Sequence, residues 1–383
     1  MRTEPQHDIL VSEQPSQVPY DRDLIRSGAV SRARSGRPQA RIDRSAPPRA
    51  GRRRSGWRFL ATVLIFLLLA AVIGSVVLGL RAATFNASVS TAPFPSTVLL
   101  GPLSGTERVN VLLVGYGGEG HDGAFLADSI QVLSIDPRSD TTTTIPIPRD
   151  LWIEGVASFA GSVRVNQVFS AGQAGGDLET AGALLTEVVS EVTGVDVEHW
   201  LSIDFDGFRG MVDAVGGVTI ENPVAFGYTT TEVRHAAGDW SIGHFEAGEI
   251  HLDGDAALAY ARARYTSVVA ESNDFARSVR QARVLAALRE QFGGGGIGSV
   301  VPGLRLMDAM EGRVRTDLSA IDLFLLSSHL SSDRRVELTE GTVLTATTNT
   351  NGAYILVPTG WTGPGAYGSL RAHLASELGG DAP

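Results

Sequence analysis

The sequence predicts an α/β fold with a central mixed β-sheet flanked by helices and preceded by one transmembrane helix. Three observations support this fold class. Short apolar runs typical of buried strands alternate with segments of helical period, which indicates layers of helices on a sheet. Two of the strand-like runs flank a turn-rich stretch and indicate a hairpin. One uncharged run of 22 residues is long enough to cross a bilayer.

The N-terminal part of the chain is strongly basic, although the 383-residue protein carries a net charge of -10. Residues 22–58 contain twelve arginines against Asp23 and Asp43, and they are rich in Ser, Pro and Gly. We therefore expect residues 1–58 to form a disordered basic tail in the cytoplasm. The chain has no cysteine, which excludes disulfides and thiol catalysis.

The apolar run from Phe59 to Leu80 follows this tail and lies between Arg58 and Arg81. Its length and its distance from the N-terminus favour a retained membrane helix over a cleaved signal peptide. Arginine-rich flanks stay in the cytoplasm, so residues 81–383 are expected outside a cell membrane that the chain crosses once. Residues 81–104, which lack a clear period, are expected to form a linker.

The outer region begins with a domain predicted over residues 105–292. Pro146 and Pro148 cannot donate ladder hydrogen bonds, so the strand that contains them is expected to end there or to lie at an edge. Residues 293–383, which follow the flexible break predicted at Gly293–Gly296, are expected to pack on the same domain. The predicted strands are Val109–Val114, Ser129–Ile135, Thr141–Ile147, Val218–Ile220 and Ala353–Val357, and the predicted helices are Glu179–Thr193, Phe208–Val215 and Ile321–Leu330.

A glycine-rich segment, Gly115-Tyr-Gly-Gly-Glu-Gly120, matches G-x-G-x-x-G directly after a predicted strand. A dinucleotide site would require a helix to begin immediately after these glycines. A second strand follows instead, from Ser129. We therefore interpret the segment as a turn, or as a loop whose backbone N–H groups approach an anion.

Arginines are concentrated between residues 258 and 281. Read as a strand, Leu258–Arg264 places Tyr260, Arg262 and Arg264 on one face. Read as a helix, the following segment places Asp274, Arg277 and Gln281 on one stripe, and an apolar stripe lies opposite: Phe275, Val279, Ala282 and Ala286. Guanidinium groups converging in this way suit phosphate oxygens. The alternative is an ordinary solvated helix face.

Several motifs occur in an order that resembles the LytR-CpsA-Psr family. They cover about residues 108–292. The matching segments are Val111-Leu-Leu-Val-Gly115, Ala127-Asp-Ser129, Ile147-Pro-Arg-Asp150, Val165-Asn166, Asp206-Gly-Phe208 with Val212-Asp-Ala-Val-Gly-Gly-Val218, Leu252-Asp-Gly-Asp-Ala-Ala-Leu-Ala-Tyr-Ala-Arg-Ala-Arg264, and Asp274-Phe-Ala-Arg277 with Arg280-Gln281.

The resemblance implies a membrane-anchored phosphotransferase that moves a glycan from a polyprenyl-pyrophosphate carrier to peptidoglycan. It further implies that the pyrophosphate is held by Arg149, Arg262, Arg264, Arg277 and Gln281. Asp128 would bind Mg²⁺ or Mn²⁺, and Asp274 would orient the arginines or assist proton removal. The lipid requires an apolar groove, and residues Leu184, Leu185, Val188 and Val192 are either part of that groove or plain core.

Two positions depart from the family pattern. Tyr116 stands where the family carries a second metal-binding Asp, and Leu126 stands where it carries an Arg. Glu119, His121 or Asp122 could replace the missing carboxylate, and Asp122 is the candidate that we adopt as a second metal ligand.

Two other functions fit parts of the sequence. A transcriptional attenuator would use the arginine-rich tail on nucleic acid, but no helix-turn-helix pattern is present, so no nucleic acid partner is expected. A protein that binds lipid-linked glycan without chemistry would explain Tyr116 and Leu126.

Overall fold

The computed structural model describes residues 54–92, 108–139, 141–230, 237–291, 300–323 and 334–379. Several predictions lie outside this part of the chain. They are the tail up to residue 53, residues 93–104 of the linker, the glycine run at 293–296, and residues 324–330 of the predicted helix Ile321–Leu330.

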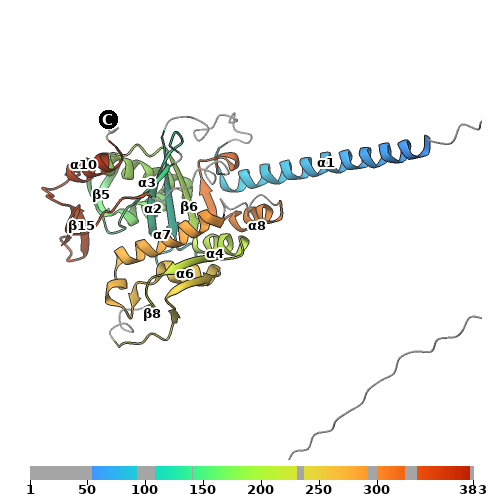
Figure 1. Cartoon of the computed structure of the whole chain (residues 1–383). Helices are drawn as coiled ribbons and strands as arrows, with labels where there is room; N and C mark the ends of the chain where they lie inside the picture. Colours follow the sequence, from blue (N-terminus) through green and yellow to red (C-terminus); the bar gives the residue numbers. More distant parts are fainter. Residues whose placement is uncertain are drawn as a thin grey trace, which may run out of the picture. The chain divides into compact units, whose positions relative to one another are not determined.

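A six-stranded sheet forms the centre of the domain, in the order β12-β6-β1-β2-β3-β13 (Figure 1). Strand β1 is parallel to β6 and antiparallel to β2, and β2 forms an antiparallel hairpin with β3. The predicted mixed sheet and hairpin are therefore confirmed, and β3 ends at Pro146 as its prolines predict. The strands are β1 Val109–Tyr116, β2 Ala127–Asp136, β3 Thr141–Pro146, β6 His199–Asp204, β12 Val314–Thr316 and β13 Arg334–Arg335.

Two helices, α2 (Val165–Gly175) and α3 (Leu178–Thr193), pack on one face of the sheet. Helix α3 begins where the Asp177 carboxylate accepts the Thr180 N–H at 2.8 Å, and it ends at Gly194 with a φ of 71°. The four residues considered for a lipid groove belong to this core. Leu185, Val188 and Val192 are fully buried, and Leu184 packs against them half-buried.

Four helices lie over the opposite face, and α7 crosses it in Figure 1. They are α4 Phe205–Ala214, α6 Gly254–Arg262, α7 Asp274–Gln291 and α8 Val300–Met310. The buried stripe of α7 is not the predicted one. Phe275, Val279, Ala282 and Ala286 are only half-buried, whereas a stripe rotated toward α6 is buried: Arg277, Arg280, Val284, Ala287 and Leu288.

The prediction of a strand at Leu258–Arg264 was wrong. Its residues up to Arg262 form the second half of α6, which Asp253 caps by accepting the Ala256 N–H at 2.8 Å. Alanine favours helix strongly, and this local preference prevails over the alternation that suggested a strand. The helix ends at Ala263, whose φ of -53° and ψ of 115° turn the chain away before Arg264.

Smaller sheets surround the central one. They consist of β4 Trp152–Val156 with β5 Phe159–Arg164, β7 Val218–Asn222 with β10 Gly248–Leu252, β8 Phe226–Thr229 with β9 Gly243–Phe245 and β11 Tyr265–Thr266, and β14 Leu344–Thr348 with β15 Tyr354–Pro358. A 3₁₀ turn, Val269–Glu271, and helix α10, Gly368–Glu377, complete the described elements. The C-terminal region is integral to the domain, because β12 and β13 pair with β6 and β3 of the central sheet.

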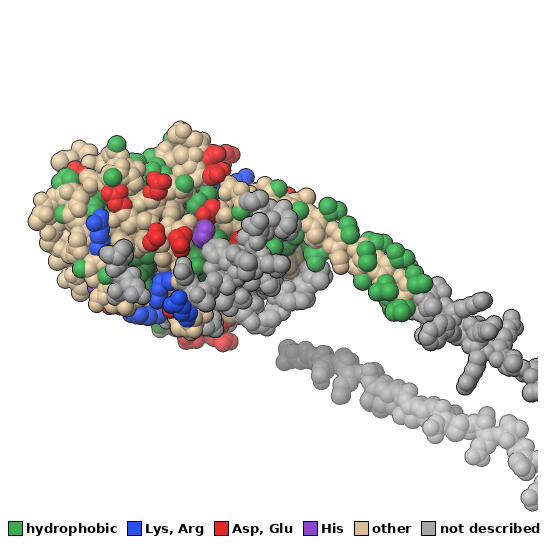
Figure 2. Space-filling view, turned by 90° about the horizontal axis from the view of Figure 1, so that it is seen from above, with side chains coloured by type: hydrophobic (Ala, Val, Ile, Leu, Met, Phe, Trp, Pro, Cys, Tyr) green, Lys and Arg blue, Asp and Glu red, His purple; other side chains and the backbone are tan. Residues whose placement is uncertain are grey.

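Helix α1 (Arg54–Val89) precedes the domain. Its apolar side chains from Leu64 to Leu80 are exposed, and Figure 2 shows them in green along the helix. By length and composition this helix is a candidate membrane span. The helix continues through residues 81–89, so the prediction of a linker is wrong there. Residues 81–92 contain no proline or glycine that would end the helix. Phe85 and Val89 are buried in this last part.

Candidate functional site

Two cavities lie beside α7 and share part of their walls. The first, here called the polar cavity, has a volume of about 430 Å³. The second, the apolar cavity, has a volume of about 330 Å³ and is lined mainly by aliphatic and aromatic side chains of the sheet and of α4, α7 and α8. Asp128, Ser129 and Gln281 line both cavities. A ligand with one anionic part and one apolar part would fit this junction.

Five arginines line the polar cavity, from five separate places in the sequence: Arg149, Arg164, Arg264, Arg277 and Arg335. Three of them, together with Gln281, were predicted from the sequence. Arg164 and Arg335 were missed. Arg164 directly precedes the Val165-Asn166 motif, which is the one signal that could have indicated it. No sequence motif marks Arg335 as a site residue, because it reaches the cavity only through the pairing of β13 with β3.

A chain of ion pairs joins four residues that line the polar cavity. The Arg149 Nη1 lies 3.2 Å from the Asp128 Oδ1, and its Nε lies 3.6 Å from the Asp150 Oδ2. The Arg164 Nη1 lies 3.5 Å from the other oxygen of Asp150. Asp150 is buried and pairs with both guanidinium groups, so it fixes their positions. Asp128 is more open, at 29% side-chain exposure.

Helix α7 contributes Arg277 and Gln281 to the polar cavity, one turn apart on the same stripe, as the sequence predicted. Arg277 is buried and Gln281 is half-buried. Asp274 is the first residue of this helix, and its side chain lies outside the described part of the structure.

Arg262 and Arg264 do not leave one strand in parallel, as predicted from the sequence. Both are exposed, but Arg264 lines the polar cavity and Arg262 lines the apolar one. The Arg262 guanidinium lies over the ring of Phe205, 4.1 Å from its centroid. Arg262 nevertheless shares its cavity with Asp128 and Gln281, so it stands beside the junction.

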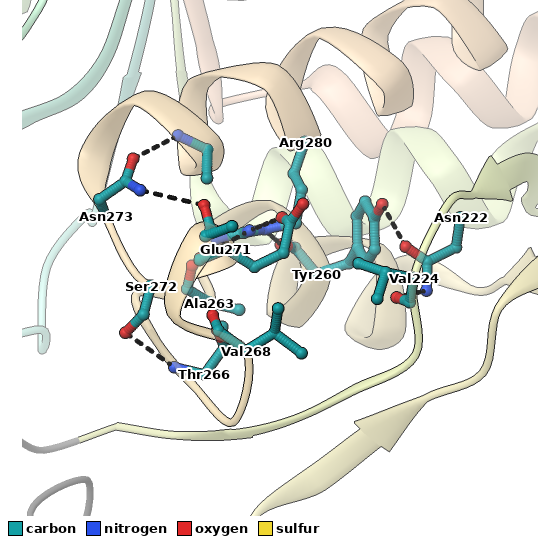
Figure 3. A network of polar contacts seen from close by, with 12 residues as sticks. Asn222, Val224, Tyr260, Ala263, Thr266, Val268, Glu271, Ser272, Asn273 and Arg280 are labelled. Atoms are coloured by element: carbon teal, nitrogen blue, oxygen red, sulfur yellow. Dashed lines mark hydrogen bonds and ion pairs between the residues drawn. The ribbon is translucent and has the colours of Figure 1, made fainter.

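Arg280, between Arg277 and Gln281, is fully buried and positions the segment that carries both exposed arginines (Figure 3). Its Nε donates to the carbonyl of Tyr260 at 3.2 Å, and another nitrogen donates to that of Ala263. Its Nη1 donates to the backbone carbonyl of Glu271 at 3.0 Å and to its carboxylate at 2.6 Å. Burial lowers the pKa of Arg280, and Glu271 opposes that shift.

Tyr116, at the position of the family's second metal-binding Asp, points into the core instead of a cavity. Its ring packs on Phe125 and Phe169, with centroids 6.1 and 5.1 Å away. Burial, aided by the charge of Asp204, raises the pKa of Tyr116 to about 12. The side chain therefore stays a neutral phenol near neutral pH and supplies no carboxylate.

The residues of the glycine-rich loop that could replace the missing metal-binding Asp do not lie in an enclosed site. Glu119, His121 and Asp122 are exposed, and none of them lines either cavity. The loop runs into β2 without a helix, as expected for a turn and not for a dinucleotide site. In the described ranges, no group of three or more Asp, Glu or His side chains could hold a metal ion. Asp128 is the carboxylate that lines both cavities.

The sequence model of the LytR_cpsA_psr family matches residues 83–360. The chain belongs to this family. The match includes the central sheet, both cavities and most of the C-terminal region, so the resemblance found in the motifs over residues 108–292 extends to residue 360.

Named relatives of this LytR-CpsA-Psr protein include a polyisoprenyl-teichoic acid–peptidoglycan teichoic acid transferase, TagU, of Bacillus anthracis. It is 30% identical over 222 residues, which are 58% of this chain and 64% of that protein. TagU of Halalkalibacterium halodurans is 28% identical over 71% of this chain and 81% of its own length.

The fold is also that of a solved Streptococcus agalactiae protein, with a TM-score of 0.55 at 20% identity over 73% of this chain and 91% of that one. At this identity the likeness concerns the fold alone.

Proposed function

We propose that this protein is a membrane-anchored phosphotransferase acting outside the cytoplasm. It transfers a glycan phosphate from a polyprenyl-pyrophosphate carrier to a hydroxyl group of peptidoglycan. The observation that carries the proposal is the meeting of an arginine-lined cavity with an apolar cavity at Asp128, Ser129 and Gln281. The carrier has the same two parts in the same order, a pyrophosphate directly joined to an apolar chain. The names of the TagU relatives support the same substrate class.

In the proposed reaction, the acceptor oxygen attacks the phosphorus next to the glycan. The bond from that phosphorus to the bridging oxygen breaks, the lipid monophosphate leaves, and the acceptor hydroxyl loses its proton. Such a reaction mainly requires positioning and charge neutralisation. Arg149, Arg264, Arg277 and Gln281 would hold the pyrophosphate from the polar cavity, with Arg262 beside the junction.

Two further roles complete the proposed site. Asp274, at the start of α7, would orient the arginines or accept the proton. Mg²⁺ or Mn²⁺ fits Asp128, because such ions are often held by one or two carboxylates together with substrate phosphates and waters. Asp122 would be the second ligand if its loop approaches the junction. When bound, the ion would neutralise charge on the pyrophosphate.

The proposed location follows from α1 and the arginines before it. The chain would cross the cell membrane once, with its N-terminus in the cytoplasm and residues 81–383 outside. A reporter fused after Pro383 should then be active only if it works outside the cytoplasm. Activity at this position of a reporter that works only in the cytoplasm would contradict the proposed topology.

Turnover of a defined lipid-pyrophosphate glycan in the presence of peptidoglycan, over a series of Mg²⁺ concentrations, tests the function. Release of lipid phosphate together with labelled peptidoglycan is the expected result. Binding without turnover would favour the glycan-binding alternative. An attenuator that acts through its tail would lose its effect when residues 1–50 are deleted, whereas the transferase should keep its turnover.

Replacing Arg262 or Arg264 by lysine is expected to lower transfer about ten- to a hundredfold. A point charge cannot reproduce the two parallel hydrogen bonds of a guanidinium group, and one bond to a charged group contributes roughly 1.5–3 kcal/mol. Arg305→Lys, an exposed arginine on α8, is the matched control. Thermal unfolding of the same samples separates loss of binding from loss of folding. Full turnover by both lysine variants would contradict their role in binding pyrophosphate.

A further inference from the structure

The apolar cavity is elongated across the strands of the central sheet, as the strand register shows. Ser129 of β2 pairs with Gly115 of β1, Gly115 pairs with Ile203 of β6, and Ile203 pairs with Val314 of β12. All four line the cavity. Strands are about 4.8 Å apart, so this row spans three spacings, or about 14 Å. The cavity therefore extends across the sheet, from the charged junction at β2 to an apolar end at β12.

At its far end the cavity is bounded by α1 and α8. Phe85 and Val89 of α1 form a buried cluster with Val314, and the side chains of Met307 and Met310 pack against this cluster. The residues of α8 that line the cavity are Gly303, Leu306, Met307 and Met310. Their spacing of three, four and seven residues places them on one face of the helix. The end of the membrane helix is therefore part of the cavity wall.

This end also lies close to where α1 leaves its apolar stretch. Arg81 is the first charged residue after Phe59–Leu80, and Phe85 follows one helical turn later, about 6 Å along the axis. Arg81 pairs with two acidic residues at the end of α8, Asp308 at 2.5 Å and Glu311 at 4.0 Å. Figure 1 shows α8 beside the C-terminal part of α1. Helix α8 thus turns its charges toward the membrane anchor and its apolar face toward the cavity.

The contact between the two helices is suited to opening. Its ion pairs join side chains that are about half exposed, 48% for Arg81 and 56% for Asp308. Exposed pairs of this kind fix orientation but contribute little stability. Hydrogen bonds from Arg315 and Ala320 hold the end of α1 to the segment around β12. The side chains of α8 at this end, Met307 and Met310, make apolar and non-directional contacts with the cluster that contains Phe85. Methionine side chains adapt readily to a changed neighbour.

We propose that α1 and α8 form a lateral entrance through which the isoprenoid tail passes from the bilayer into the apolar cavity. Phe85 and Met307 contact the tail there, and Arg81 with Asp308 keeps the two helices in place at the membrane surface. The tail then reaches the cavity without crossing water, while its pyrophosphate advances to Asp128. This inference rests on the proposed function, since it assigns the tail of the same donor.

A cross-linking experiment tests the entrance, and the absence of cysteine makes it specific. The double variant Arg81→Cys with Asp308→Cys, in the full chain reconstituted in liposomes, is joined by a short bismaleimide. Two donors carry the same glycan, one on a long polyprenyl chain in the bilayer and one on a short, water-soluble isoprenyl chain. Cross-linking should lower turnover of the long-chain donor at least about tenfold, because a gate that cannot open limits turnover. Turnover of the short-chain donor should be unchanged.

The matched control is the pair Arg108→Cys with Asp136→Cys, which replaces another surface ion pair, 3.5 Å long, at the far ends of β1 and β2. Cross-linking it should affect neither donor. Equal loss with both donors, or no loss with either, in the α1–α8 variant would overturn the proposed entrance. No turnover of either donor by the unmodified protein would instead reject the phosphotransferase function.

A photolabelling experiment, which does not depend on turnover, tests the entrance directly. A long-chain polyprenyl pyrophosphate with a diazirine on its tail should label α1 near Phe85 and α8 near Met307. Labelling confined to α7, with none on α1 or α8, would overturn the inference even if the protein is an active transferase.

Discussion

Replacing Asp128 by alanine is expected to lower transfer by about a hundredfold or more. Its carboxylate lines both cavities at their junction and lies 3.2 Å from Arg149. In the proposed site it is the protein's main contribution to the cation, and a catalytic metal ion stabilises the transition state by several kcal/mol. Transfer rates over a range of Mg²⁺ concentrations measure the effect. The melting temperature should change little, because Asp128 is partly open to solvent.

Asp122→Ala, at the proposed second ligand, is the comparison variant for this experiment. The side chain is a carboxylate in the loop before β2, but it is exposed and lines neither cavity. A smaller loss in Asp122→Ala is expected if it is a secondary ligand. An equal loss would show that the glycine-rich loop moves to the junction. Undiminished transfer by Asp128→Ala, with the same Mg²⁺ dependence, would contradict the metal site.

Replacing Arg280 by methionine is expected to reduce the free energy of unfolding by about 3–5 kcal/mol, the usual cost of breaking a buried ion pair. Methionine fills similar space but leaves the Glu271 carboxylate and the carbonyls of Tyr260, Ala263 and Glu271 without their donor. Because these groups belong to the end of α6 and the segment after it, the variant should also lose transfer. Urea unfolding and turnover on the same preparation measure both effects.

Arg138→Met, in the exposed turn between β2 and β3, is the control and should leave the unfolding curve in place. Glu271→Gln is a second test, since it removes the charge partner while keeping the shape. A destabilisation by Arg280→Met no larger than that of Arg138→Met would mean that the buried network does not hold α6 to α7.

Local signals were sufficient for several elements. The 22-residue uncharged run predicted α1, the turn-rich stretch between two apolar runs predicted the β2–β3 hairpin, and Gly194 correctly marked the end of α3. These features depend on neighbours along the chain, such as hydrogen bonds four residues apart or a turn of a few residues. The ordered motifs also identified the family, because their residue types and spacings are themselves local patterns.

Other features depend on packing between distant segments, and the sequence did not determine them. The alternation in Leu258–Arg264 suggested a strand, although the alanines and the cap at Asp253 are local helix signals; the burial of Tyr260 in α6 is what the packing adds. The apolar positions of α3 are equally suited to a groove or to a core. The helices that cover each face of the sheet decide whether a cavity remains on that face.

The sequence by itself determined the family, the membrane-helix candidate, the central mixed sheet and most of the residue types of the site. The tertiary structure decided where those residues meet. It brought Arg164 and Arg335 to the cavity of Arg149 through the pairing of β5 with β4 and of β13 with β3, and it assigned Arg280 to the interior. The physical reason is that a side chain's charge and size are local properties. Its burial and partners depend on which distant segments pack against it.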